Sequence, residues 1–264
     1  MENGQDKRVV AIIGARGGIG KALVSTYLDD DVELLLTANS RYDELAAWAK
    51  DLEPERGASV RTFRADLSSQ KGAERLAEEL LTAPRIDSLV VASGIDLMTP
   101  ANKALDFDAR LARAWQIDVA STITLARSIG AAMASRSRSV PGGGASPGVV
   151  LFGWDGAFRG QEGETAQIYS TCKGAVVAFA RSLAQELAPY VRVNAVSPGW
   201  IKTTWGEQAS PAANRRAADE SLAGRWGAAE EVARVVRFLL SDDASFLNGQ
   251  DIQVNGGFSF LRRG

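Results

Sequence analysis

The stretch "GARGGIG", residues 14–20, separates an apolar run at 8–14 from a run with helical spacing at 19–30. A glycine at 14 permits a tight turn, a glycine at 18 lets a ligand approach the backbone, and a glycine at 20 lets helix and strand pack closely. The helix that follows directs its first N–H groups at an anion, so the stretch predicts a pyrophosphate site. An ordinary glycine-rich turn is the alternative. The residues expected at the bound group are Gly14, Arg16, Gly18, Ile19 and Gly20.

Apolar strand-like runs and helical runs alternate along the rest of the chain. Further strands are expected at 32–38, 59–65, 87–93, 148–153, 191–197 and 250–256, and further helices at 42–52, 72–81, 107–134, 166–189 and 229–241. This alternation predicts a parallel sheet with helices on both faces, and right-handed crossovers make it doubly wound. We therefore predict an α/β fold with a Rossmann-like sheet, as a single domain over residues 1–264.

Composition excludes several classes of function. The chain has 264 residues, 45% of them hydrophobic, and a net charge of −2, which argues against a basic nucleic-acid face. No apolar run approaches the roughly 20 residues of a membrane helix, and the start of the chain is polar, so we expect a cytoplasmic protein without a membrane anchor. There is no histidine and one cysteine, which excludes an internal disulfide and a histidine-based metal site. No metal is expected, and a general acid or base must be Tyr, Lys, Asp, Glu or Cys.

The end of the second expected strand bears on the choice of cofactor. NAD-binding folds usually place an acidic residue here, on the ribose hydroxyl. In this chain the tip instead reads Ala38, Asn39, Ser40, Arg41. A small polar pair with an arginine can hold a 2′-phosphate through charge-assisted hydrogen bonds, so NADP is favoured over NAD. Arg41 at the start of a helix, in contact only with solvent, is the alternative.

The stretch "YSTCK" opens the long helix after the fifth expected strand. Tyr169 and Lys173 are four residues apart and so share one face of the helix. A lysine ammonium beside a phenol lowers the pKa of the phenol, which lets it act as an acid or base near neutral pH. If the helix did not follow the fifth expected strand, the same spacing would indicate only an amphipathic helix.

Together these motifs resemble the short-chain dehydrogenase/reductase family. The resemblance runs from "IIGARGGIG" (12–20) through "YSTCKGAVVAFARSLAQELAPYVRVNAVSPGW" (169–200) to "GQDIQVNGGF" (249–258). It implies a seven-stranded sheet and a nicotinamide cofactor. It also implies that Tyr169 gives a proton to a carbonyl, while Lys173 holds the nicotinamide ribose and tunes Tyr169. The same resemblance implies further cofactor contacts in "RADLSS", "VVASG" and "SPGWIKT", namely Asp66, Leu67, Ala92, Ser93, Gly94, Pro198, Gly199, Ile201 and Thr203.

Two positions depart from the family pattern. The active-site asparagine of the family aligns with Asp118 in "WQIDVAS". The catalytic serine aligns with Gly153, and counting leaves Trp154 or Gly156 as alternatives. No Ser, Thr or Tyr lies between residues 147 and 164. Losing one such hydrogen-bond donor typically costs about 10²–10³ in rate at an oxyanion.

The missing donor suggests an unusual substrate. An imine or iminium carbon is already electrophilic, and the carboxylate of Asp155 is a candidate to stabilise such a cation or to accept a proton. The alternative is structural: Asp155 caps a turn or pairs with Arg159. The catalytic candidates are Tyr169, Lys173, Asp155 and Asp118.

A tryptophan-containing segment at about 198–227 corresponds to the part of the family that covers the substrate. Aromatic residues over a crevice suit a sizeable apolar small molecule. We expect Gly153, Trp154, Trp200 and Trp205 at the substrate, with Trp226 in the core. The helices at 107–134 and 167–188 resemble those that form the dimer interface of the family, so a homo-oligomer, either a dimer or a tetramer, is expected.

The leading hypothesis is an NADP-dependent oxidoreductase that reduces a carbonyl or imine/iminium group. A non-redox or mixed tailoring enzyme of secondary metabolism on the same fold is a second hypothesis, which the missing serine and asparagine favour and the Tyr169–Lys173 pair opposes. A non-catalytic sensor of nicotinamide nucleotides is the third.

Overall fold

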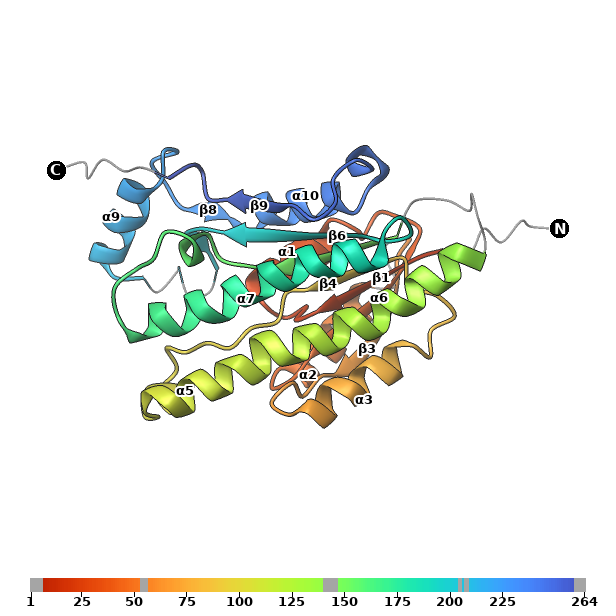
Figure 1. The fold of residues 1–264 in the computed structure, drawn as a ribbon, viewed down its shortest axis with the longest axis horizontal. Helices are drawn as coiled ribbons and strands as arrows, with labels where there is room; N and C mark the ends of the chain where they lie inside the picture. The colour runs from red at the N-terminus through yellow and green to blue at the C-terminus, as the bar shows by residue number, and fades with distance from the viewer. Residues whose placement is uncertain (1–6, 53–56, 140–146, 204–205, 207–208, 259–264) are drawn as a thin grey trace.

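The computed structural model describes residues 7–52, 57–139, 147–203, 206 and 209–258. Seven parallel strands form one sheet in the order β3-β2-β1-β4-β5-β6-β9 (Figure 1). Their bounds are β1 (Arg8–Ile13), β2 (Val32–Ala38), β3 (Ser59–Arg64), β4 (Ser88–Val91), β5 (Gly148–Phe152), β6 (Arg192–Pro198) and β9 (Asp251–Val254). The strand order reverses between β1 and β4, which confirms the predicted doubly wound, single Rossmann-like domain.

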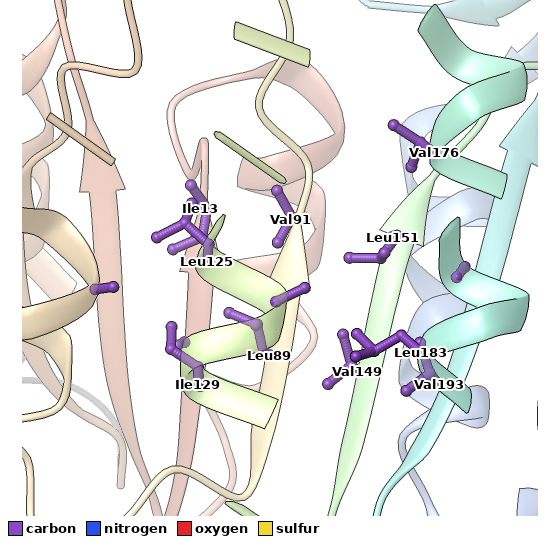
Figure 2. Close-up of a cluster of buried hydrophobic side chains, with 14 of the residues drawn as sticks. Ile13, Leu89, Val91, Leu125, Ile129, Val149, Leu151, Val176, Leu183 and Val193 are labelled. Carbon is purple, nitrogen blue, oxygen red and sulfur yellow. The ribbon is translucent and has the colours of Figure 1, made fainter. Parts of the chain in front are cut away.

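The apolar runs are continuous because both faces of the sheet are covered. Along β1, Val9 and Ala11 face one hydrophobic cluster while Val10 and Ile12 face the other, as the two-residue period of a strand requires. The first cluster packs under α3 (Gln70–Leu80), α6 (Ser121–Ser139) and α7 (Glu164–Leu187), and Figure 2 shows part of it. The second packs under α1 (Gly18–Ser25), α2 (Tyr42–Leu52) and α10 (Ala229–Leu239).

Side-chain caps fix the starts of several helices. The Ser69 hydroxyl accepts a hydrogen bond from the Gly72 N–H at the start of α3. The Asp106 carboxylate accepts one from the Ala109 N–H at 2.8 Å, which starts α5 (Phe107–Ala114). Each cap satisfies a backbone donor that the first turn leaves without a partner.

The helix predicted over 107–134 is not continuous. The structure divides it into α5, a π-helical turn η1 (Trp115–Ala120), and α6. Figure 1 shows α5 and α6 following one another beside α7. Apolar spacing does not reveal the extra residue that a π-turn accommodates, and such turns occur often at functional sites. Asp118 lies within this turn.

The remaining elements lie mainly at the carboxyl ends of the strands. They are α4 (Pro100–Lys103), η2 (Asp155–Ala157), β7 (Ile201–Lys202), α9 (Pro211–Glu220), β8 (Gly227–Ala228) and η3 (Asp242–Ala244). The strands β7 and β8 pair within the expected substrate-covering segment. Within the described ranges, no helix has both the length and the apolarity needed to cross a membrane.

Candidate active site

In the glycine-rich stretch between β1 and α1, positions 14, 18 and 20 leave no room for a side chain. Gly14 has φ +90°, and a Cβ there would lie 2.8 Å from the Ser93 backbone nitrogen. A Cβ at Gly20 would lie 2.3 Å from the Gly14 carbonyl oxygen, and one at Gly18 would lie 2.7 Å from the Thr203 side chain. No side chain caps the N-terminus of α1. The loop therefore leaves bare backbone beside a helix N-terminus, the arrangement expected for a pyrophosphate.

A cavity of about 480 Å³ opens from this loop along the carboxyl ends of β1, β2, β3 and β4. It brings together ten of the predicted cofactor residues, Gly14, Arg16, Asn39, Ser40, Arg41, Asp66, Leu67, Ala92, Ser93 and Gly94. It also includes residues that sequence reasoning missed, among them Gly17, Thr37, Ser68, Ile95, Arg113 and Ile117. Arg113 and Ile117 could have been identified from the sequence, because they lie about one helical turn apart and Ile117 directly precedes Asp118.

The charges around the cavity favour an anionic ligand. Arg16 forms an ion pair with Glu44 at 2.5 Å, and its guanidinium lies over the Trp48 ring. Arg41 and Arg113 are exposed at the cavity rim. Asp66 is the acidic residue among those that line the cavity. Its carboxylate accepts hydrogen bonds from the hydroxyl and the N–H of Ser68, which lower the pKa of this carboxyl group. Asn39 and Ser40 are exposed next to Arg41, and no acid occupies this strand end.

Tyr169 and Lys173 meet at the start of α7, as their spacing predicted. The Lys173 Nζ lies 5.5 Å from the centre of the Tyr169 ring. Burial raises the pKa of the Tyr169 phenol above its usual value, and the opposing effect of the Lys173 ammonium is smaller. The expected lowering of this pKa therefore does not occur in the protein alone. Burial is the largest single effect on the pKa of Lys173 and lowers it, but the combined opposing effects of Asp118, Tyr169 and Cys172 leave this pKa raised.

Asp118, in the π-helical turn η1, contacts Lys173. Its side chain is fully buried, and its Oδ1 lies 3.4 Å from the Lys173 Nζ and accepts a hydrogen bond from the Ile95 N–H at 3.2 Å. A Cβ at Gly94 would lie 2.9 Å from the same oxygen, so the backbone after β4 closes tightly over the carboxyl group. Burial raises the pKa of Asp118, with Lys173 opposing. Its Oδ2 is buried and has no hydrogen-bond partner among the described residues.

The end of β5 corrects the expected position of the hydrogen-bond donor. A Cβ at Gly153 would lie 2.4 Å from the Ser197 Oγ and 2.6 Å from the Val177 Cγ2, both in the buried layer between the sheet and α7. A side chain at 153 would therefore point into this buried layer. The Trp154 ring instead lies edge-on to the Tyr169 ring, with ring centres 5.4 Å apart. Position 154 faces the phenol, and it carries an indole.

Asp155 pairs with Arg159, which is the structural alternative that the sequence left open. Its buried Oδ2 accepts hydrogen bonds from the Arg159 Nη2 at 2.6 Å and the Asn255 Nδ2 at 3.1 Å. The Arg159 guanidinium lies over the Phe258 ring, 3.6 Å from its centre. Burial raises the pKa of Asp155, and Asn255 and Arg159 oppose that effect. This cluster ties the end of β5 to the segment after β9, and its carboxylate is occupied by these partners.

The segment after β6 returns to the glycine-rich loop. Pro198 ends β6, Gly199 lies against Asn255, and Ile201 is buried in β7. Thr203 lies beside Gly18, where an added Cβ would be 2.7 Å from the threonine side chain. Ile19 packs against the cluster under α1.

The tryptophans of the expected covering segment pack on one another. The Trp200 Nε1 donates a hydrogen bond to the Glu220 Oε2 at 2.8 Å, and its ring meets the Trp226 ring edge-on at 5.3 Å. Both side chains are half-buried, so Trp226 is less enclosed than predicted. The substrate role expected for Trp205 lies outside the described residues.

Known proteins share this architecture and sequence. The family model described as enoyl-(acyl carrier protein) reductase matches residues 14–259. The uncharacterized oxidoreductase YmfI of Bacillus subtilis is 35% identical over 256 residues, covering 95% of this chain and 98% of that protein. A short-chain dehydrogenase/reductase from Brucella melitensis, described as a glucose/ribitol dehydrogenase, has a TM-score of 0.79 at 32% identity, covering 96% and 97% of the two chains. ElxO, solved with NADP bound, shares the fold with a TM-score of 0.80 at 21% identity, covering 95% and 98%. The chain belongs to the short-chain dehydrogenase/reductase family of oxidoreductases.

Proposed function

We propose that the protein is an NADP-dependent oxidoreductase that reduces a carbonyl or imine/iminium group of a sizeable apolar small molecule. The observation that carries this proposal is the meeting of Tyr169 and Lys173 at the carboxyl edge of the sheet, beside a cavity that begins at the glycine-rich loop. A proton donor and a dinucleotide-sized groove thereby share one edge, which is where ligands bind in open α/β sheets.

The residues present fit a nicotinamide dinucleotide. The bare backbone at Gly14 and Gly18 and the open N-terminus of α1 suit the pyrophosphate. We assign the 2′-phosphate to Asn39, Ser40 and Arg41, as charge-assisted hydrogen bonds favour. Lys173 is assigned to the nicotinamide ribose and Thr203 to the carboxamide. When bound, the nicotinamide supplies the hydride.

In this proposal, residues of the protein itself donate the proton and bind the substrate. Tyr169 carries its proton at neutral pH, because burial raises its pKa, and in this proposal it donates that proton to the substrate oxygen or nitrogen. The Trp154 indole beside it supplies an aromatic surface where the family serine would supply a hydroxyl. Such a surface favours an apolar or cationic group over a simple alcohol or ketone. Asp155 takes no part in this proton transfer, since Arg159 and Asn255 hold its carboxylate.

We also propose that copies of the chain associate through α6 and α7, which lie side by side at the surface in Figure 1, to give a dimer or tetramer. Trp115, the first residue of the π-helical turn that precedes α6, is 45% exposed. Light scattering coupled to gel filtration measures this, and a monomer at micromolar concentration would contradict it.

The test of the proposed function has two stages. Quenching of intrinsic fluorescence by NADPH and by NADH measures binding, and NADPH is expected to bind more tightly. Oxidation of NADPH is then followed with ketones and cyclic imines that carry apolar groups. A protein that binds neither nucleotide would contradict both the reductase and the sensor hypotheses. Binding without turnover on any substrate would favour the sensor, and product formation without NADPH oxidation would favour the non-redox enzyme.

A further inference from the structure

Asp118 places a carboxyl group where the family resemblance leads one to expect a neutral amide. Its side chain is completely buried in the π-helical turn, and its Oδ1 lies 3.4 Å from the Lys173 Nζ. The lysine side chain is itself only 5% exposed, so solvent screens the pair weakly. The same Nζ lies 5.5 Å from the centre of the Tyr169 ring. The three groups therefore interact electrostatically, with Asp118 and Lys173 buried and Tyr169 half-buried.

A lysine cation alone beside Tyr169 would favour the phenolate. A carboxylate on the far side of that lysine opposes this effect, because the phenol then faces an ion pair whose net charge is zero. An asparagine could keep the hydrogen bonds to Lys173 and Ile95 and would leave the lysine charge uncompensated. The chemical difference between the two residues at position 118 is therefore one unit of charge close to the proton donor.

We propose that Asp118 is a positioning residue that neutralises the charge of Lys173 and so removes the stabilisation that this lysine would otherwise give to a Tyr169 phenolate. This inference rests on the proposed function only for the use of the Tyr169 proton; the electrostatic effect is a property of the protein without any ligand.

The other charged groups near Tyr169 do not replace this effect. Burial is the main cause that raises the pKa of Tyr169; Lys173 lowers it, and Asp118 contributes more to raising it than the remaining acids do. Arg110 reaches the start of α7 from α5, where it pairs with Glu164. The groups that face Tyr169 are Lys173 and Cys172 from α7, Asp118 from the π-helical turn, and Asp96 from the segment after β4.

The experiment measures the ionisation of Tyr169 in the protein without nucleotide. The ultraviolet absorbance of tyrosinate is titrated with pH, and the curve of the matching Tyr169→Phe protein is subtracted, because the chain has four tyrosines. In Asp118→Asn, the midpoint for Tyr169 should fall by about one pH unit or more, the size of effect that a nearby buried charge exerts. This corresponds to a roughly tenfold or larger rise in its acid dissociation constant.

Three further variants keep the test decisive. Asp87→Asn also removes a buried, ion-paired carboxylate, but at the opposite, amino end of β4, and it should leave the Tyr169 midpoint unchanged. Lys173→Gln leaves the Asp118 charge alone and should raise the midpoint. The double variant Asp118→Asn/Lys173→Gln should return it toward the wild-type value, since both charges are then gone.

An unchanged or raised midpoint in folded Asp118→Asn would overturn the proposal. So would a double variant with the same midpoint as Lys173→Gln alone. Because the titration needs neither nucleotide nor substrate, its failure is distinct from a failure of the proposed function, which would appear as absent NADPH oxidation.

Discussion

Introducing a serine at Gly153 should damage the fold without supplying a hydrogen-bond donor. The aligned position of the family carries that hydroxyl, so Gly153→Ser is the substitution that sequence alignment alone would choose. In the structure the new Cβ would lie 2.4 Å from the Ser197 Oγ and 2.6 Å from the Val177 Cγ2. Ser197 has little freedom to move, because it is buried and its hydroxyl donates a hydrogen bond to Asp251 at 2.6 Å.

The expected cost follows from overpacking of a buried layer, which is typically about 1–3 kcal/mol. For a domain of this size each kcal/mol lowers Tm by roughly 2–4 °C, so a decrease of roughly 2–12 °C is expected. Scanning fluorimetry measures it. Gly174→Ser is the matched control, since a Cβ there meets nothing within 4 Å and a serine is slightly favoured over glycine in a helix. Its Tm should stay level or rise.

Activity provides the second measurement on the same variants. NADPH-dependent reduction by Gly153→Ser should not exceed that of the wild type, because the hydroxyl would point away from Tyr169. Trp154→Ser places a hydroxyl at the position that faces Tyr169, so a gain on ketones is expected there and not at 153. A Gly153→Ser protein with wild-type Tm and faster ketone reduction would refute this account of the end of β5.

Three further changes test other parts of the molecule. Arg41→Ala should raise the Kd for NADPH by about 10–100-fold through the loss of a charge-assisted contact while leaving the Kd for NADH within about twofold, and equal losses for both nucleotides would count against a 2′-phosphate site. Asp155→Asn should lower stability by about 1–3 kcal/mol yet retain turnover, because its carboxylate holds structural partners; lost turnover at unchanged Tm would assign it to catalysis. Arg225 and a backbone N–H hold the pKa of Glu231 at about 2, below its ordinary value of 4.5, so its stabilising effect is present above about pH 4.5 and is lost as the pH falls toward 2. The Tm difference between wild type and Glu231→Gln should shrink over that range, and a constant difference would contradict the assignment.

Much of the fold was predictable because its signals are local. Continuous apolar runs such as β5 and most of β1 require a sheet covered on both faces, and the glycine-rich loop marks the first turn. The pairing of Tyr169 with Lys173 follows from helical spacing alone. These predictions depend only on residues that are neighbours along the chain or on one turn of a helix.

The rest depends on packing that spacing does not encode. Which of residues 153 and 154 faces Tyr169 depends on the register at the end of β5. A shift of one residue along a strand moves a side chain to the other face of the sheet. The π-helical turn that carries Asp118 has no apolar signature. The net direction of the Tyr169 pKa shift was also missed, because burial and the Asp118 charge depend on chain segments far away in sequence.

The most direct test of the proposed function compares wild type with Tyr169→Phe under NADPH, using an apolar ketone and a cyclic tertiary iminium of similar shape. If Tyr169 is the proton donor, ketone reduction should fall by about 10²–10⁴, the usual contribution of a general acid. Iminium reduction should fall much less, because a tertiary nitrogen takes up no proton, and NADPH binding should persist. A Tyr169→Phe protein that still reduces the ketone at the wild-type rate would contradict the central claim.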